Sequence, residues 1–539
     1  MDGVLRTEIR PFQRIGTMLD CSRNAVANLD SLRSWIDLTA SLGFTTLMLY
    51  TEDTYELDAN PYFGYLRGRY SKEELKEIDA YAASKHIELI PCIQTLAHLR
   101  TLKRWAEYEP HFDAEDILMV DDAYVYVLIE HMFASLAQSF SSRIAHIGMD
   151  EAGMLGRGRY LEQHGYHNRT ELLQKHLKRV AGIGAKYGFS LLVWSDLFFR
   201  HADSEQSTRY DDMEPQIPDN VTLVYWDYDS TEKTHYDRCL RAHSALKPDS
   251  WFAGGLWSWT GYAPHNGFSI RTARAALKSC RDRGVQNVFF TLWGDDGGEC
   301  SRYALLPALF YVSELAHGNL NEQAIKSSFQ QKFHLSFDEF MLLDLPQTPN
   351  GTDTQICNAE KYLLYQDCFL GLMDQNVAPG SGEQYAHCAM RLAPYTQNQI
   401  WGYLFSTQKA LCEVLSLKAE LGIRTQQAYA SRSRDLLGLL LKDYQKTEQR
   451  LISFYEALKR QWFLENKPHG FDVQDLRLGG LIWRIRSCKE RLQALYDGKI
   501  DRIEELEETR LELLGHGAAP GETAMCYNSW RLTVTVNPI

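Results

Sequence analysis

Two adjacent carboxylates, Asp150 and Glu151, follow the apolar segment His146-Ile-Gly-Met and are the side chains best placed to do chemistry. Side chains alternate along a β-strand, so neighbouring acids face one ligand only where the strand ends and its backbone turns. Two carboxylates held against one bond suit glycoside hydrolysis, in which one protonates the leaving oxygen and the other stabilises positive charge near the sugar ring. An isolated Asp-Glu pair is also typical of a helix N-terminus, so the surrounding elements must decide between the two interpretations.

Apolar segments with strand composition alternate with helical patterns over the first 320 or so residues, which predicts repeated βα units. Several segments are apolar throughout, as expected of parallel strands buried on both faces. Each ends in polar or aromatic residues, and in a (β/α)8 TIM barrel these ends form the catalytic face. The predicted strands are residues 17–21, 45–53, 87–95, 144–151, 191–196, 222–229, 251–259 and 287–296.

The helical segments carry recognisable start and stop signals. Leu29, Leu32, Ile36 and Leu42 share one helical face that stops at Gly43, and Ser71-Lys-Glu-Glu opens the next helix as a capping box. After about residue 330 the strand patterns stop, and residues 395–514 read as long amphipathic helices. We therefore predict an α/β protein with a catalytic barrel over residues 1–325 and a mostly α-helical region over 326–539. A short strand over 531–536 should end that region, which we expect to stabilise the fold or form a dimer.

The composition indicates a soluble globular protein of more than one domain. Its 539 residues contain 45% hydrophobic and 24% charged residues, and the formal net charge of −13 argues against a nucleic-acid partner. The N-terminus lacks the pattern of a signal peptide, and no apolar run is long enough to cross a membrane. The 11 cysteines, an odd number without paired spacing, favour a cytoplasmic setting. The sequence has no C-x-x-C or H-E-x-x-H spacing, so we predict no metal and no cofactor.

Read in order, the strand-end motifs resemble glycoside hydrolase family 20, the β-N-acetylhexosaminidases. His146-x-Gly-x-Asp-Glu151 is similar to the family signature, and four flanking segments agree with it over about residues 10–320. These segments are Met18-Leu-Asp-Cys-Ser-Arg23, Thr51-Glu-Asp53, Ile90-Pro-Cys-Ile-Gln-Thr-Leu-Ala-His98 and Trp293-Gly-Asp295. The chain resembles a form of the family without the small α/β domain that often precedes the barrel.

The resemblance implies an exo-acting retaining hydrolase that releases terminal β-linked GlcNAc, GalNAc or both from a glycan. The substrate's own 2-acetamido oxygen is the nucleophile, so the intermediate is an oxazolinium. Glu151 is the implied acid and base, Asp150 orients the acetamido group, and a tyrosine, Tyr228 or alternatively Tyr262, holds the acetamido oxygen. The implied substrate-binding residues are Arg23, Glu52, His98, Trp194, Trp226, Trp257, Trp259, Trp293 and Asp295.

Some positions depart from the family pattern, and two other functions remain open. Glu52 stands where the family usually has a hydroxyl-binding Asp, and Asp295 stands where it usually has Glu. A retaining β-glycosidase could instead use a protein nucleophile such as Asp196, Asp227 or Glu299. A carbohydrate-binding barrel without activity is the other alternative. The sequence leaves the preference between GlcNAc and GalNAc, the linkage, the aglycone and a possible homodimer open.

Overall fold

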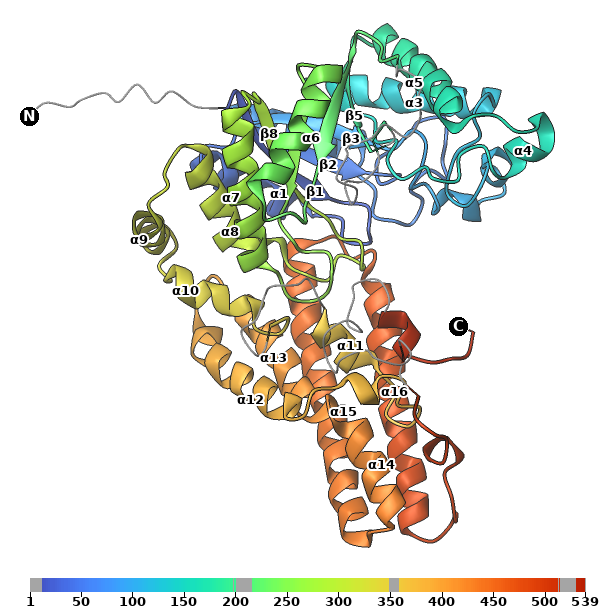
Figure 1. Ribbon diagram of the computed structural model, residues 1–539, viewed down its shortest axis with the longest axis vertical. Helices are drawn as coiled ribbons and strands as arrows, with labels where there is room; N and C mark the ends of the chain where they lie inside the picture. Colours follow the sequence, from blue (N-terminus) through green and yellow to red (C-terminus); the bar gives the residue numbers. More distant parts are fainter. Residues whose placement is uncertain are drawn as a thin grey trace, which may run out of the picture. The chain divides into compact units, whose positions relative to one another are not determined.

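The computed structural model describes residues 12–196, 198–199, 216–348, 358–511, 513 and 530–538. Eight parallel strands pair in sequence order, and the last pairs with the first, so the sheet closes into a barrel (Figure 1). The predicted (β/α)8 fold is therefore confirmed. The strands are β1 (Arg14–Asp20), β2 (Thr46–Thr51), β3 (Glu88–Ile93), β4 (Ile144–His146), β5 (Ser190–Trp194), β6 (Val221–Trp226), β7 (Trp251–Gly255) and β8 (Asn287–Leu292).

The strand β4 is much shorter than the predicted segment of residues 144–151. Its extended backbone stops because Gly148 and Met149 have φ angles of 69° and 74°, in the left-handed region. Side chains bind the main-chain N–H groups there: Gly148 N donates to His146 Nδ1 (3.1 Å) and Met149 N donates to Gln94 Oε1 (3.0 Å). The acids therefore follow a turn, as the sequence predicts, but the turn begins earlier.

The two helices for which the sequence gives start or stop signals follow those signals. Asn28 caps the first helix by accepting from Ser31 N (2.8 Å), and Gly43 follows that helix with a φ of 81°. Ser71 and Glu74 form the predicted capping box. The helices are α1 (Leu29–Ser41), α2 (Lys72–Ser84), α3 (Ala123–Ser139), α4 (Arg159–His164), α5 (Arg169–Lys186), α6 (Lys233–Leu246), α7 (Asn266–Asp282), α8 (Leu306–Ala316) and α9 (Glu322–Phe333).

The described residues divide into two compact units. The barrel unit runs to Leu256 and includes Ser269–Trp293 and Ala308–Ile325, whereas the helical unit comprises Trp257–Phe268, Gly294–Pro307 and the residues from Lys326 onward. The loops after β7 and β8 therefore group with the helical unit, although we predicted the whole of residues 1–325 as one barrel domain. Tyr262 shows why: its ring packs edge-on against Phe454 at 5.1 Å, inside the helical unit.

Long helices build the second unit, as predicted for residues 395–514. The longest two run side by side (Figure 1) and bury apolar side chains at helical spacing, including Tyr444, Leu451, Ile485 and Leu492. None of the described helices is long and apolar enough to span a membrane. The helices are α10 (Phe337–Phe340), α11 (Ala359–Tyr365), α12 (Ser381–Leu392), α13 (Gly402–Lys418), α14 (Leu421–Ser431), α15 (Arg434–Glu465) and α16 (Phe471–Tyr496).

The predicted terminal strand over residues 531–536 is wrong. Trp530–Thr533 forms a 3-10 helical turn, because Trp530 and Thr533 are both buried and residues three apart share one side of such a turn. The Trp530 indole N–H donates to Asp296 Oδ1 (3.1 Å), and the Thr533 hydroxyl donates to the Trp530 carbonyl (2.7 Å). Alternating residue types in a short segment cannot reveal such anchoring by one aromatic side chain.

A buried ion cluster beside Trp530 gives a stability prediction for the helical unit. Lys361 is fully buried, pairs with Asp296 (2.8 Å) and also contacts Glu299, which Arg477 binds at 2.7 Å. Lys361→Met should lower the free energy of unfolding by on the order of 3 kcal/mol, because it leaves the Asp296 carboxylate buried without its cation and leaves Glu299 with Arg477 alone. Chemical denaturation measures this loss. Lys442→Met, at an exposed position of α15, is the matched control, and equal stability of the two variants would contradict the prediction.

Candidate active site

The acid pair lies in the turn that follows β4, and its two members have different surroundings. The Asp150 side chain is 12% exposed, whereas the Glu151 side chain is 60% exposed. Glu151 itself has a φ of 56°, so the left-handed backbone continues through the pair and lets both acids leave the strand direction. Backbone strain of this kind persists only where the surroundings fix it, and here side chains from the ends of β3 and β5 do so.

Asp150 has a different partner at each carboxylate oxygen. Gln94 Nε2 donates to Oδ1 at 2.7 Å, and His98 Nε2 lies 3.2 Å from Oδ2. Burial alone would raise the pKa of Asp150, but the charge of His98 and these hydrogen bonds lower it to about 2. Burial likewise disfavours a charged imidazole, yet the Asp150 carboxylate raises the pKa of His98 to about 10. Asp150 therefore stays ionised at neutral pH beside a protonated His98.

The Glu151 carboxylate is open to solvent and lies beside His98. Its Oε2 lies 3.6 Å from His98 Nε2, and its main-chain N–H donates to Asp196 Oδ2 at 3.0 Å. Asp196 also accepts from the Trp226 indole (3.3 Å), so the end of β5 fixes the backbone of the acid. One fixed, ionised carboxylate beside one exposed carboxylate is an arrangement that can stabilise a cation and transfer a proton.

An arginine and a second acid lie at the ends of β1 and β2. Arg23 binds Asp20 Oδ2 (3.0 Å) and Glu52 Oε1 (3.1 Å), and its guanidinium lies over the rings of Tyr50 (4.8 Å) and Trp293 (5.1 Å). Burial raises the pKa of Glu52 to about 7, although Arg23 opposes the shift. Fixed donors and acceptors of this kind are suited to binding sugar hydroxyl groups.

Aromatic rings line the barrel beside these charges. Trp293 meets Tyr50 edge-on at 4.7 Å, and its indole N–H donates to the Tyr228 hydroxyl at 3.0 Å. The Trp226 ring lies 5.1 Å from that of Tyr228. Trp194, which is predicted to bind substrate, is only 1% exposed and packs against His146 at 4.3 Å.

Four predicted residues belong to the helical unit. Trp257 and Trp259 stack on each other at 4.2 Å, and Asp295 is exposed. Tyr262 is fully buried, and its hydroxyl lies 2.8 Å from that of Tyr365. The structure therefore gathers Arg23, Glu52, His98, Asp150, Glu151, Trp194, Trp226, Tyr228 and Trp293 in the barrel unit and leaves these four in the other.

The candidate protein nucleophiles occupy three different settings. Asp196 lies beside Glu151 and accepts from its main-chain N–H. Asp227 binds His235 at 2.6 Å, and burial, which would raise its pKa, is outweighed by this partner. Glu299 is buried in the ion cluster of the helical unit. Among the described residues, no group of three or more His, Cys, Asp or Glu side chains is arranged to hold a metal ion.

Gln94 and Tyr50 contact the site but were not among the residues predicted from the sequence. Gln94 is fully buried at the end of β3 and binds both Asp150 and Tyr50, whose hydroxyl lies 3.3 Å from Glu52 Oε1. The sequence signal for both residues is position, because Gln94 lies one residue before the end of a predicted strand and Tyr50 lies two residues before Glu52. A polar side chain at a strand end can be inferred from the sequence, but its partner cannot.

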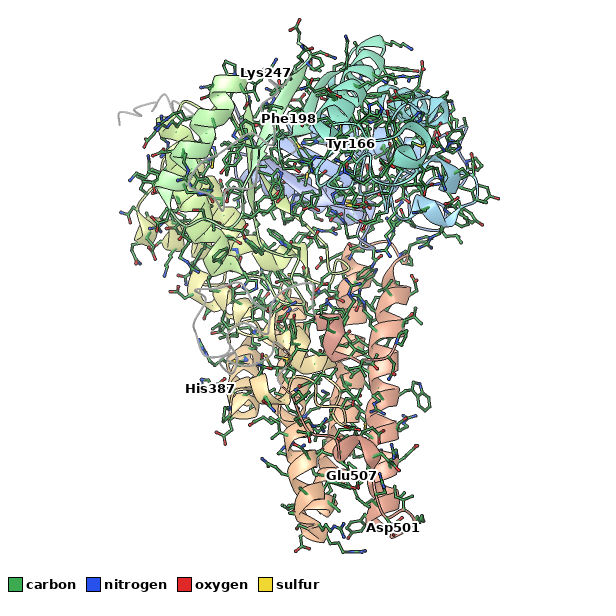
Figure 2. The ribbon with its side chains drawn as sticks, turned by 45° about the vertical axis from the view of Figure 1, so that its right-hand side comes forward. Tyr166, Phe198, Lys247, His387, Asp501 and Glu507 are labelled. Carbon is green, nitrogen blue, oxygen red and sulfur yellow. The ribbon has the colours of Figure 1, made fainter. Side chains whose placement is uncertain are left out.

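The segment after Glu151 includes strongly exposed positions. Tyr166, in the connection between α4 and α5, is 71% exposed (Figure 2), and the Arg157 guanidinium lies 4.7 Å from the centre of its ring. Arg157 also donates to main-chain carbonyls of its own connection, at Gly156 (3.2 Å) and His167 (3.3 Å). This arginine therefore stabilises the connection itself.

Two family models match this chain, one in each part of the sequence. The family "Glycosyl hydrolase family 20, catalytic domain" matches residues 12–241, and "Glycoside Hydrolase 20C C-terminal domain" matches residues 338–525. Human Hexosaminidase D is 29% identical over 273 residues, covering 44% of this chain and 52% of that protein. Hexosaminidase D of Bos taurus is 27% identical over 250 residues, covering 42% and 64%. The chain thus spans less than two thirds of the length of these curated relatives.

A solved structure of a β-N-acetylhexosaminidase from Bacteroides fragilis is also similar, with a TM-score of 0.47 and 18% identity over 60% of this chain and 70% of that one. The two family matches cover the first six strands of the barrel with the acid pair and most of the helical region. The chain belongs to glycosyl hydrolase family 20.

Proposed function

We propose that this protein is an exo-acting, retaining β-N-acetylhexosaminidase that removes terminal β-linked GlcNAc, GalNAc or both from glycans. The observation that carries the proposal is the contrast between the two acids, with Asp150 at 12% exposure and Glu151 at 60%. A buried, ionised carboxylate suits a cation that forms during the reaction, whereas an exposed carboxylate suits proton transfer to and from water. The family match to the segment that contains both acids supports this assignment.

In the proposed reaction the 2-acetamido oxygen of the substrate attacks C1, and the bond from C1 to the leaving oxygen breaks. Glu151 gives its proton to the leaving oxygen and later takes a proton from the water that attacks C1. Asp150 accepts the acetamido N–H and offsets the positive charge of the oxazolinium. C1 is attacked twice from opposite faces, so its configuration is retained.

The other barrel residues have proposed roles in binding. Tyr228 holds the acetamido oxygen, which Trp293 supports by fixing the tyrosine hydroxyl with its indole N–H (3.0 Å). Trp293 faces the sugar ring, and Arg23, Glu52 and His98 bind hydroxyl groups. Trp194 and Trp226 border the acetyl group. Trp257, Trp259 and Asp295 are also proposed to bind substrate.

Matched aryl substrates test the proposed function. We expect hydrolysis of 4-nitrophenyl β-GlcNAc, β-GalNAc or both, and no release above background from the matching β-glucoside and β-galactoside. The reason is that the acetamido group supplies the nucleophile and is held next to C1. Comparable rates on the unacetylated sugars would favour a protein nucleophile, and Asp196 would be the first residue to test. Binding of GlcNAc without hydrolysis of any substrate would favour the carbohydrate-binding alternative.

Two further expectations concern the setting of the enzyme. We propose a cytoplasmic location, which rests on the odd number and unpaired spacing of the 11 cysteines. We also propose that the helical region supports a homodimer, without a specified interface. Light scattering of the purified protein measures the second point, and a mass equal to one chain at micromolar concentration would contradict it.

A further inference from the structure

Gln94 is a fully buried amide at the end of β3 whose polar atoms meet three different groups of the barrel unit. Its Nε2 donates to Asp150 Oδ1 at 2.7 Å and to the Tyr50 hydroxyl at 2.9 Å. Its Oε1 accepts from the main-chain N–H of Met149 at 3.0 Å. Both amide protons and the amide oxygen are therefore used, which is typical of a buried amide with a single fixed orientation.

The direction of the amide is determined by its partners. A main-chain N–H can only donate, so the oxygen of Gln94 must face Met149, and the NH2 group must then face Asp150. The reversed amide would place its oxygen against the Asp150 carboxylate and its NH2 group against another donor. The turn after β4 thus selects the orientation in which Gln94 stabilises an ionised Asp150.

The same amide also fixes the backbone that carries the acids. A Cβ at Gly148 would lie 2.0 Å from Gln94 Oε1, so the glutamine occupies the space beside this glycine. Met149 is held with a φ of 74° by its bond to Gln94. A side chain that binds both the turn and the carboxylate sets the position of the carboxylate relative to the barrel.

A short hydrogen-bonded chain continues from Gln94 towards β2. The Tyr50 hydroxyl accepts from Gln94 and donates to Glu52 Oε1 at 3.3 Å, and Glu52 binds Arg23 at 3.1 Å. Gln94 donates to Asp150 and to Tyr50, and Tyr50 donates to Glu52. Each end of this chain is therefore an accepting carboxylate. Gln94 is therefore the branch point between the acetamido side and the hydroxyl side of the site.

We propose that Gln94 is a positioning residue for Asp150: it holds the carboxylate in the ionised form and in the direction needed by the substrate's acetamido N–H. The inference rests on the proposed function for its effect on the reaction, and Gln94 acts through Asp150 without a contact to substrate. Gln94→Leu should lower kcat by about 10-fold with KM within about twofold, since the interaction acts on charge that develops in the transition state.

Gln94→Glu separates positioning from a merely structural role. When the introduced carboxyl group is protonated, its hydroxyl can donate to Asp150 as the amide does, and its other oxygen can still accept from Met149. When that group is ionised, the donor is lost and a second negative charge faces Asp150. We therefore expect kcat/KM of this variant to approach the wild-type value at acidic pH and to fall as the pH rises from about 5 to 7. Gln94→Leu should show the same loss at every pH.

The other titratable groups near Asp150 define the reference for this comparison. His98 faces it from the β3 loop, His146 and Cys92 lie in β4 and β3, and Tyr50 and Glu151 complete the surroundings. Glu52 is linked to the chain through Tyr50, and burial raises its pKa to about 7. These groups are the same in the wild type and the variants. Only a pH dependence of kcat/KM that is new in Gln94→Glu is therefore evidence for the contact with Asp150.

The experiment combines kinetics with thermal unfolding at several pH values. In an Asp150→Ala background Gln94→Leu should change kcat/KM less than about twofold, because the group it positions is gone. Thr95→Val removes a neighbouring buried hydrogen bond to Ile147 (2.9 Å) that does not reach Asp150, and it should leave the shape of the pH profile unchanged. Equal losses in both backgrounds, or parallel pH profiles of the Leu and Glu variants, would overturn the inference.

Melting temperatures test the inference independently of any activity. A carboxyl group at position 94 beside Asp150 has a higher pKa in the folded than in the unfolded protein, so the folded state binds more protons and stability falls as the pH rises between the two values. The Tm of Gln94→Glu relative to wild type should drop by about 2–4 °C between about pH 5 and pH 8. A constant difference would refute the contact with Asp150, whereas failure of acetamido substrates with this Tm trend intact would refute only the proposed function.

Discussion

Glu151→Gln is expected to lower kcat by about 10²- to 10⁴-fold on a natural disaccharide, the usual contribution of general acid–base catalysis. The amide keeps the size of the side chain but has no proton to give to the leaving oxygen. The loss should shrink for aryl glycosides with acidic leaving groups, because these leave without a proton. Steady-state kinetics on a series of aryl leaving groups measures the trend, which should become steeper in the variant than in the wild type.

A neighbouring carboxylate provides the control for this prediction. Glu162 is an exposed acid in α4, a short distance along the chain from Glu151, and Glu162→Gln should retain wild-type kinetics. Near-full activity of Glu151→Gln on the disaccharide would mean that Glu151 is not the acid. Rescue of the variant by added azide would support the assignment, because a small anion can then attack the cationic intermediate in place of activated water.

The barrel could be predicted because its signals are local and repeated. Each buried strand is an apolar run, and helices that follow carry their own caps, such as Asn28 or Ser71, so the alternation survives small errors in any one element. The end of β4 was harder to locate. Its last residues are apolar like a strand, but Gly148 and Met149 turn because Gln94, more than 50 residues earlier in the chain, accepts from Met149 N.

The acid pair could be predicted for the same reason, since Asp150 and Glu151 are adjacent and follow a strand. What gives them different environments comes from distant segments: His98 and Gln94 after β3 for one acid, and Asp196 after β5 for the other. The sequence places these residues at strand ends but does not state which atoms meet. Trp257, Trp259 and Asp295 illustrate the other limit, because their loops pack with the helical unit and their proximity in sequence to β7 and β8 does not fix their partners.

Asp150→Asn is expected to lower kcat by about 10²- to 10³-fold while KM changes little. The proposed role of Asp150 concerns a positive charge that forms only in and after the transition state, so its removal should cost rate far more than substrate binding. The structure adds a geometric reason. One carboxylate oxygen accepts from Gln94 at 2.7 Å and the other pairs with His98 at 3.2 Å, and an asparagine has only one oxygen to offer these two partners.

The asparagine NH2 group must therefore face a donor or turn toward the substrate, where it opposes the acetamido N–H. A thiazoline analogue of the bicyclic intermediate should bind the wild type tightly and this variant weakly, whereas the substrate should bind both about equally. Asp196→Asn is the matched control for thiazoline binding, which it should leave close to wild type, because Asp196 contacts the main chain of Glu151 at 3.0 Å but has no part in stabilising the proposed intermediate. A covalent ester between the sugar and Asp196 or any other carboxylate of the wild type would exclude the substrate-assisted mechanism, since the acetamido oxygen would then not be the nucleophile.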